Sequence, residues 1–423
     1  MKLNKLALAM AAIVAAPAAF ALSPTTAPDL TVSLSGASAQ QGNLVAIAEK
    51  LMVAGTIDVF YNDASGSNHR AVFGTIKPTG TVVGSVTIDS KIGGKKVLLL
   101  DRAQGGSFQG VGPVARSQSI AALSTTGCTS SGLTYPSPTY YCANTVSLVP
   151  DAGVSDVEPA MFRGANLPTG ETALSAAELA SMDVASQNAV IMGLAVTDNY
   201  TLPSISKAAA QSIMSGTYTD WSQVDASLAG PIILETRTAG SGTKAMANAW
   251  YLNNPCSTAG LVPSGPQGDP VNFSTFTVVE NSSTGGVKSG LNAVWNKGAM
   301  GVGIISLENT PGANDHWHFV AIDGVAPTVA NAINGSYTNF TEQSMQWRAA
   351  DNTSGNATVQ AKNAFLQAFR ATSADPSVLS TLPGVAATAF VYDPASPYVG
   401  IMLKGTRAGV TGPSTCQPVQ MFY

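Results

Sequence analysis

Charged and aromatic residues are both scarce in this chain of 423 residues, at 11% and 7% of the sequence. Its 21 basic residues against 25 acidic ones cannot form the basic surface that general nucleic-acid binding requires, so no nucleic-acid partner is expected. The low aromatic content argues against a sugar-stacking lectin surface. Three histidines and no Cys-x-x-Cys pair argue against a structural zinc site.

The chain is instead rich in apolar and turn-forming residues, with 45% hydrophobic residues, 41 glycines and 24 prolines. This composition is typical of a globular protein with many turns, and the length suffices for two or three domains. Beyond the N-terminal segment, no apolar run reaches the roughly 20 residues of a membrane-spanning helix.

Residues 1–21 have the features of a secretory signal peptide. Lys2 and Lys5 precede an apolar run, and 19-AFA-21 fits an A-x-A cleavage site. We expect a mature chain from Leu22 with 19 basic and 25 acidic residues, a net charge of about −6. No cysteine follows the predicted cut, which argues against a lipid anchor. Export to the periplasm is therefore expected, with secretion as an alternative.

The cysteine count predicts two disulfides. All four cysteines follow the predicted signal peptide, and an even number in an oxidising compartment indicates disulfide pairing. Cys128 and Cys142 enclose a short loop, so this pair is preferred among the three possible connectivities. Cys256 and Cys416 would then join the middle of the chain to its C-terminus.

Strand-like and helix-like segments alternate along most of the chain, which indicates an α/β fold. The expected strands are 30–36, 57–63, 97–102, 189–197, 231–237, 276–280 and 301–306. The expected helices are 38–52, 175–182, 206–216, 242–253, 284–298 and 357–373. The polar segments 62–70, 125–142 and 254–270 are expected to be loops.

The stretch 235-ETRTAGSGTKAMANAWYL-252 contains the features of an anion site. A strand runs into Gly-Ser-Gly-Thr, and a helix-like pattern follows at once. The first amides of a helix have no intrahelical partner and lie at its positive end, so they bind anions. Arg237 could add a forked contact to an oxyanion. An ordinary helix cap is the alternative, whereas the Gly-Thr-Lys order does not fit a nucleotide-binding loop.

Several segments in order resemble the periplasmic phosphate-binding proteins, which are type II solute-binding proteins of ABC transporters. They are the first loop 33-SLSGASAQ-40, the strand end 154-VSDVEPAMF-162, 213-IMSGTYTDWSQVD-225, the Arg-x-x-x-Ser-Gly-Thr loop, and 285-GGVKSGLNAVWNKGAMGVGIIS-306. Together they cover most of residues 31–310. The resemblance implies two lobes, each a mainly parallel sheet flanked by helices, with the ligand in the cleft between them.

The resemblance also implies the ligand-binding residues, which are Ser38, Ser107, Asp156, Arg237, Ser241, Gly242 and Thr243. Ser38 could equally cap the helix that follows it, and Ser65 or Ser67 is an alternative to Ser107. Asp156 could be a surface helix cap. As a ligand contact, its carboxylate can only accept hydrogen bonds, so it would favour an anion that retains a proton and repel sulfate.

Two departures from the family pattern leave the identity of the anion open. Ala239 stands where the family commonly has an aspartate two residues after the arginine, and Ala39 stands where an aromatic residue is usual. The segments 62–95 and 125–150 exceed the compact core of the family. The ligand is therefore phosphate, another oxyanion, or a larger molecule with an anionic group.

Catalysis is not expected, and no cofactor or metal is called for. Ser107 lacks the Gly-x-Ser-x-Gly setting of hydrolases. His316 and His318 have the spacing that places both on one strand face, but the sequence offers no third metal ligand. A secreted phosphatase would need a serine or a metal to turn over its substrate.

The sequence thus predicts an exported monomer that captures phosphate or a related oxyanion, with an inner-membrane ABC permease as its partner. The first lobe would comprise residues 22–196 and 301–423, and the second residues 197–300. The alternative is a relative of the binding proteins that serves as a secreted or surface adhesion protein without a transport role.

Overall fold

The computed structural model describes residues 26–39, 41–63, 66, 68–254, 260–268, 272–388 and 401–402. The predicted signal peptide, Ser65 and Ser67, and the Cys256–Cys416 pair lie outside the described residues. The predictions made for them stay predictions.

The first lobe is built around three parallel strands in the order β6–β1–β11. They are β1 (Leu30–Gly36), β6 (Lys96–Arg102) and β11 (Ala152–Ser155). Two further strands, β3 (His69–Thr75) and β2 (Asp58–Tyr61), extend this sheet in antiparallel fashion beyond β6. The helices α1 (Gln41–Lys50) and α8 (Ala357–Ala374) contribute to a core with β1, in which Leu34, Ile47 and Phe365 are fully buried. In β6 the consecutive residues Val97–Leu100 are all buried, as in a strand that is covered on both faces.

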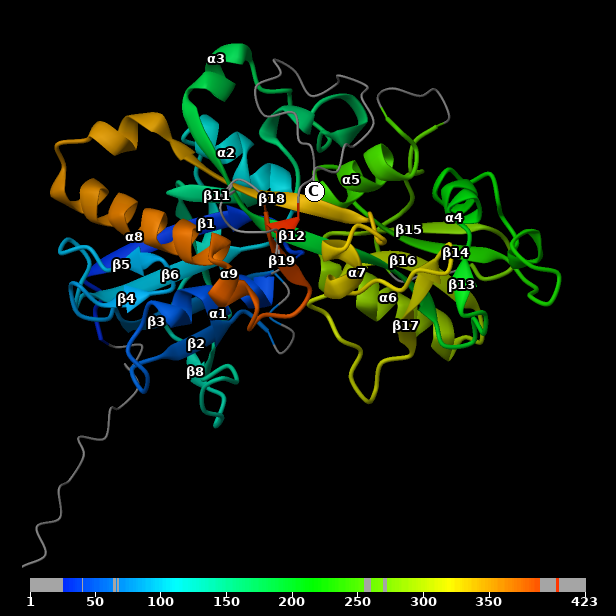
Figure 1. The fold of residues 1–423 in the computed structure, drawn as a ribbon, viewed down its shortest axis with the longest axis horizontal. Coiled ribbons are helices and arrows are strands. Elements are labelled where there is room, and N and C mark those ends of the chain that lie inside the picture. The colour runs from blue at the N-terminus through cyan, green and yellow to red at the C-terminus, as the bar shows by residue number, and fades with distance from the viewer. Residues whose placement is uncertain are drawn as a thin grey trace, which may run out of the picture.

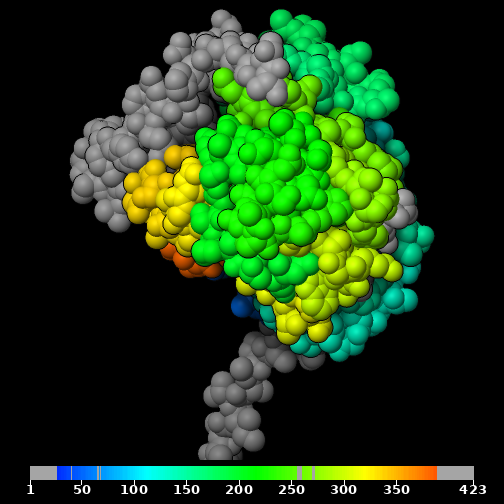
Figure 2. All heavy atoms as spheres, turned by 90° about the vertical axis from the view of Figure 1, so that its right-hand side faces the viewer, coloured from blue at the N-terminus to red at the C-terminus, as the bar shows by residue number. Residues whose placement is uncertain are grey.

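The second lobe has its own parallel set, in the order β15–β14–β16. These strands are β14 (Ile232–Arg237), β15 (Thr277–Asn281) and β16 (Met300–Ser306). The helices around them are α4 (Lys207–Met214), α5 (Gly242–Trp250) and α6 (Thr284–Asn296). Figure 2 views the molecule from the end of this lobe, where the green segment that contains α4 covers the outer surface.

One long strand, β12 (Met182–Thr197), connects the two lobes. Its first part pairs with β18 (Phe340–Arg348), which in turn pairs with β11 of the first lobe. Its last part pairs with β16 and with β17 (Trp317–Ile322) of the second lobe. Figure 1 shows β12 and β18 running through the middle of the molecule between the two sets of strands.

The remaining elements are short. They are β4 (Val82–Val83), β5 (Val86–Thr87), β7 (Ile120–Leu123), β8 (Thr129–Ser130), β9 (Tyr140–Tyr141), β10 (Thr145–Leu148), β13 (Ser204–Ile205), β19 (Val385–Thr388), β20 (Ile401–Met402), α2 (Gly112–Ala115), α3 (Ala176–Ala180), α7 (Val329–Ile333) and α9 (Pro376–Leu379). Cys128 and Cys142, beside β8 and β9, form the predicted disulfide, which is thereby confirmed. No helix in the described part of the chain is long and apolar enough to cross a membrane.

The predicted two-lobed α/β fold is confirmed, although antiparallel strands join the two parallel sets. Each expected helix is present with bounds a few residues shorter or shifted, and each expected strand is present. The prediction of a loop over 62–70 is wrong at its end, because His69 and Arg70 begin β3. The prediction of a loop over 125–142 is wrong in part, because the short paired strands β8 and β9 lie within it. The residue boundaries predicted for the lobes stay a prediction; β16 and β17 themselves pair with the second-lobe part of β12.

Candidate functional site

The predicted ligand-binding residues come together where the carboxyl ends of the parallel strands of both lobes meet. Ser38 follows β1, Ser107 follows β6 and Asp156 follows β11. Arg237 ends β14, and Ser241 caps the helix α5 that comes next. Parallel strands place the loops after their carboxyl ends at one edge of a sheet. The fold therefore brings together loops from four places in the sequence.

Ser107, Asp156 and Gly242 form the centre of this group. The Ser107 hydroxyl donates to Asp156 Oδ2 over 3.3 Å, and the Asp156 amide donates to Ser107 Oγ over 3.2 Å. A Cβ atom at position 242 would lie 2.5 Å from Ser107 Oγ and 2.7 Å from Asp156 Cβ. Glycine at 242 therefore allows the start of α5 in the second lobe to lie against two first-lobe loops.

Arg237 is held by the turn between β15 and α6. Its Nε donates to the Asn281 carbonyl over 3.1 Å, and its Nη2 donates to the Ser282 carbonyl over 3.0 Å. The side chain is 3% exposed. Burial lowers the pKa of Arg237 to about 10, although the nearby Asp156 carboxylate opposes that shift. Arg237 thus stays positively charged at neutral pH in a buried position.

Asp156 is a buried acid whose ionisation is unfavourable. Burial raises its pKa to about 6, and the opposing influences are the charge of Arg237 and hydrogen bonding by neighbouring side chains, Ser107 among them. Thr243 is close enough to lower this pKa, yet its hydroxyl makes no hydrogen bond of ordinary geometry with any described residue. Asp156 Oδ1 likewise has no such partner among the described residues. Among the described residues, one buried polar atom from each lobe thus lacks a hydrogen bond of ordinary geometry, while Thr243 and Gln343 still lie near enough to the Asp156 carboxyl to lower its pKa.

Ser241 is a helix cap as well as a member of the group. Its hydroxyl accepts from the Lys244 amide over 3.4 Å at the start of α5. Lys244 itself is paired with Glu280 at 2.5 Å. Arg237 is therefore the cation at the centre of the group, because the charge of Lys244 is already compensated.

Sequence reasoning missed Thr284, the first residue of α6. Its hydroxyl lies 3.2 Å from the Ser38 hydroxyl and 3.4 Å from Arg237 Nη1. Thr284 is 5% exposed. It follows a strand within a Ser/Thr-rich turn, 281-NSSTGG-286, in which residue types alone do not single out one hydroxyl.

A second group that sequence reasoning missed joins the lobes around Gly240. The Gly240 amide donates to the Asn166 carbonyl over 3.0 Å, and the Phe108 amide donates to the Gly240 carbonyl over 2.9 Å. Asn248 of α5 donates through Nδ2 to Asn166 Oδ1 over 3.0 Å. Both backbone polar groups of Gly240, in the second lobe, are thus bonded to the first lobe.

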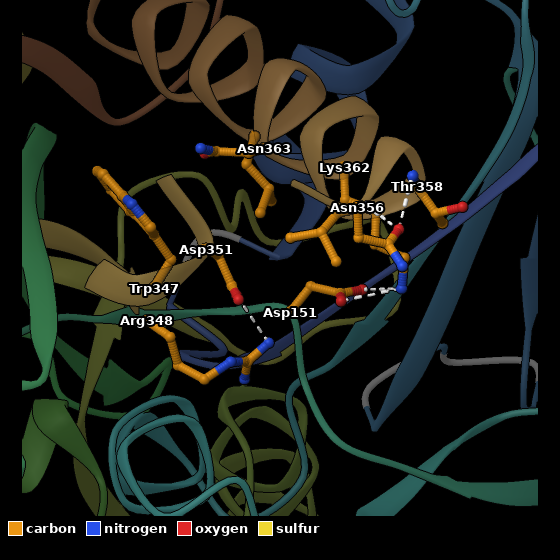
Figure 3. A pocket seen from close by; sticks show the side chains of 10 residues that line it. Asp151, Trp347, Arg348, Asp351, Asn356, Thr358, Lys362 and Asn363 are labelled. Carbon is orange, nitrogen blue, oxygen red and sulfur yellow. Dashed lines mark hydrogen bonds and ion pairs between the residues drawn. The ribbon is translucent and has the colours of Figure 1, made fainter. Parts of the chain in front are cut away.

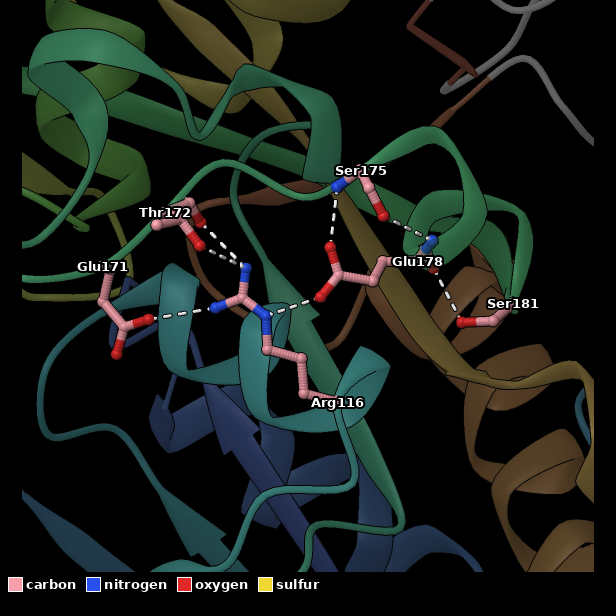
Figure 4. A network of polar contacts seen from close by, with 6 residues as sticks. All are labelled: Arg116, Glu171, Thr172, Ser175, Glu178 and Ser181. Carbon is pink, nitrogen blue, oxygen red and sulfur yellow. Dashed lines mark hydrogen bonds and ion pairs between the residues drawn. The ribbon is translucent and has the colours of Figure 1, made fainter.

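Arg116 anchors the segment that carries Asn166. Figure 4 shows its guanidinium between Glu171, Thr172 and Glu178, with Ser175 capping α3 beside them. Arg116 Nε lies 2.7 Å from Glu178, and its Nη1 lies 3.0 Å from Glu171. The segment 163–181 is thereby fixed to the end of α2 at one point and to the loop around Gly240 at another.

A larger pocket than the one beside Arg237 lies elsewhere. Figure 3 shows this pocket, about 380 Å³ in volume, between β18 and the start of α8. Its charged side chains form ion pairs with each other, Asp151 with Lys362 at 2.9 Å and Arg348 with Asp351 at 3.0 Å. A second cavity, about 10 Å³, lies against Arg237 and Thr243 inside the second lobe, which is room for about one water molecule.

The histidine pair lies in the second lobe. His318 Nδ1 is 3.1 Å from Asp198 Oδ1, and His316 Nδ1 is 3.8 Å from Asp198 Oδ2. His316 stacks on Trp295 with ring centroids 3.5 Å apart. Among the described residues, no group of three or more His, Cys, Asp or Glu side chains is arranged to hold a metal ion.

No protein-family model matches the chain, and no curated protein matches its sequence. Among solved structures, it is similar to a protein with bound phosphate from Clostridium perfringens, named as a phosphate ABC transporter substrate-binding protein, with 15% identity and a TM-score of 0.47 over 83% of this chain and 97% of that one. It is also similar to an ABC-type phosphate transport receptor from Vibrio cholerae (14% identity, TM-score 0.41, 79% and 93% covered). A third similar structure is PstS from Borrelia burgdorferi, with 12% identity and a TM-score of 0.37 over 88% of this chain and 99% of that one. These neighbours are of the class that the sequence motifs resemble.

Proposed function

We propose that this chain is an exported, periplasmic solute-binding protein that captures phosphate or a related oxyanion between its two lobes. An inner-membrane ABC permease would be the partner that receives the ligand. The proposal involves no chemistry on the ligand, and the protein would act as a monomer. The ligand contacts would be Ser38, Ser107, Asp156, Arg237, Ser241, Gly242 and Thr243.

The observation that carries this proposal is the buried charge of Arg237 near Asp156 Oδ1 and Thr243 Oγ1, two buried atoms that make no hydrogen bond of ordinary geometry with the described residues. A buried cation is unfavourable unless an anion or strong acceptors compensate it. The described contacts of Arg237 are with neutral acceptors, apart from the electrostatic influence of Asp156. The N-terminus of α5 adds amides that favour an anion. Thr243 Oγ1 offers a hydroxyl donor without another described partner.

Asp156 is the basis for proposing an anion that still carries a proton. A carboxylate offers only acceptors, so a ligand oxygen beside it must donate. Monohydrogen phosphate has such a proton, whereas fully ionised sulfate does not. The unpartnered Asp156 Oδ1 is the acceptor that this ligand proton would use.

Ligand exchange requires the lobes to separate in this proposal. All the proposed side-chain contacts are at most 6% exposed, and lobe-to-lobe hydrogen bonds run through Gly240 and Ser38. A strand such as β12, which is shared by both lobes, can serve as a hinge while the two cores move as units.

The test uses the unpartnered hydroxyl of Thr243. Thr243→Val keeps the shape of the side chain and removes a hydroxyl whose one described interaction is its influence on the Asp156 carboxyl. The free energy of unfolding without ligand should change little. The phosphate Kd should rise about tenfold, as expected when one hydrogen bond to a charged ligand is lost. Isothermal titration calorimetry with phosphate and sulfate measures both affinities.

Thr372→Val is the matched control, because Thr372 is also buried in a helix with a hydroxyl that lacks a described partner. Its phosphate affinity should equal that of the wild type. No heat and no shift in melting temperature at millimolar phosphate, arsenate or sulfate would refute oxyanion capture and favour the adhesion alternative. Hydrolysis of p-nitrophenyl phosphate would instead favour a secreted phosphatase.

A further inference from the structure

Thr284 occupies a position that contacts both lobes at the oxyanion site. It is the first residue of α6, a helix of 13 residues that starts directly after β15. Its amide donates to Ser38 Oγ over 3.4 Å, and its hydroxyl lies 3.4 Å from the Ser38 carbonyl. The same hydroxyl accepts from Arg237 Nη1. One small side chain thus joins the first loop of the first lobe to the arginine of the second.

The hydrogen bonds of Arg237 show what this contact leaves available. A guanidinium has five N–H groups. The described contacts use one each on Nε, Nη1 and Nη2, with Asn281, Thr284 and Ser282 as acceptors. One N–H on each of Nη1 and Nη2 remains available to an oxyanion. Thr284 therefore occupies one of the two Nη1 protons and leaves the other for the ligand.

Thr284 also contacts Ser38, the proposed ligand contact in the first loop of the first lobe. Thr284 has one hydroxyl proton, and the Ser38 carbonyl is an acceptor for it. Ser38 Oγ already accepts from the Thr284 amide, so its lone pair is partly used and its own proton can be donated. The two hydroxyl oxygens lie 3.2 Å apart, and either can donate to the other. Contacts with the amide and the hydroxyl of Thr284 thus hold the Ser38 hydroxyl in place.

We infer that Thr284 is a positioning residue of the oxyanion site, whose hydroxyl aligns Arg237 and Ser38 for the ligand when the lobes are closed. This inference rests on the proposed oxyanion-binding function. It adds a residue of α6 to the site, and it makes the ligand contacts of the two lobes depend on each other.

The experiment compares Thr284→Val and Thr284→Ser by phosphate calorimetry. Valine removes the hydroxyl and keeps the branched shape, so the phosphate Kd should rise about 10- to 100-fold, since a hydrogen bond to a charged group is lost. Serine keeps the hydroxyl and should stay within about threefold of the wild type. Thr372→Val is again the control for a buried threonine in a helix and should not change Kd.

A double-mutant cycle separates positioning from a merely structural role. Ser38→Ala and Thr284→Val should be non-additive, with the double variant binding phosphate no more than about threefold more weakly than the weaker single variant. Full additivity, a wild-type Kd for Thr284→Val, or failure of Thr284→Ser to restore binding would overturn the inference. If the wild type binds phosphate, these results leave the proposed function intact. If the wild type binds no oxyanion, the proposed function and the inference both fail.

Discussion

At the scale of single residues, the site combines a buried acid with a buried cation. Asp156 and Arg237 come from different lobes and influence each other electrostatically. Burial opposes the charge on both, which raises the pKa of the acid and lowers that of the base. Such paired perturbation is found at ligand and catalytic sites more often than on ordinary surfaces.

The raised pKa of Asp156 predicts how stability depends on pH. The native state holds this proton up to a pH of about 6, whereas the usual aspartate value is 3.8. The native state thus binds more protons than the unfolded state in this range, and the free energy of unfolding falls as pH rises. Relative to Asp156→Asn, the wild type should lose up to about 3 kcal/mol between pH 4 and pH 8.

Urea denaturation of the ligand-free proteins at several pH values measures this difference. Thr372→Val removes no ionisable group, so the difference between its free energy of unfolding and that of the wild type should be the same at every pH. An equally constant difference for Asp156→Asn would contradict the account of a carboxyl whose ionisation is suppressed by burial.

Residue identities were only partly predictable from the sequence. Arg237 and the Ser-Gly-Thr that follows it could be identified because an arginine before a helix start has a distinct pattern. Thr284 and Asn166 could not be identified in this way, because a threonine after Ser-Ser and an asparagine in a polar segment are both common in ordinary turns. Their positions depend on contacts with Ser38 and Gly240, far away in the sequence.

At the scale of elements, the segment 163–181 links the two lobes beside the site. Asn166 Nδ2 donates to the Met161 carbonyl over 3.2 Å, while its Oδ1 accepts from Asn248. Asn248 Oδ1 also accepts from the Val262 amide over 2.8 Å. A chain of buried amides therefore runs from the first lobe through α5 to the loop before β15.

Asn166→Ala should destabilise the protein by about 1–3 kcal/mol, because it leaves the buried Asn248 side-chain amide without its acceptor and removes one of the two hydrogen bonds to the Met161 carbonyl. The loop around Gly240 would also lose part of its support, so phosphate affinity should fall. Chemical denaturation and calorimetry measure the two effects. Asn334→Ala, at an exposed site, should stay within about 0.5 kcal/mol of the wild type. A variant at Asn166 with unchanged stability and affinity would show that this segment does not support the site.

Helices and strands with a regular pattern of apolar residues could be predicted from the sequence. Segments in which buried polar residues interrupt that pattern could not. β12 was expected over 189–197 but starts at Met182, because its first residues include Gln187 and Asn188. These two amides are fully buried and donate to Ser373 of α8. A tertiary contact thus compensates polar residues that argue against a buried strand.

At the scale of the whole molecule, the order of loops along the chain was more informative than any one of them. Each predicted contact follows a parallel strand, so the fold brings these loops to one junction of the two lobes. The antiparallel strands β12 and β18, which connect the lobes, have no comparable signature. The sequence therefore indicated which loops meet, but it did not indicate how the lobes are connected.

The central claim is that Arg237 and the surrounding loops bind an oxyanion, and a calorimetric titration of wild type and Arg237→Ala with phosphate tests it most directly. The wild type should bind phosphate, and the variant should bind at least about tenfold more weakly, since a charged hydrogen-bonded contact is lost. Circular dichroism spectra that match the wild type would show that the variant is folded. Equal affinities of a folded variant and the wild type would contradict the account.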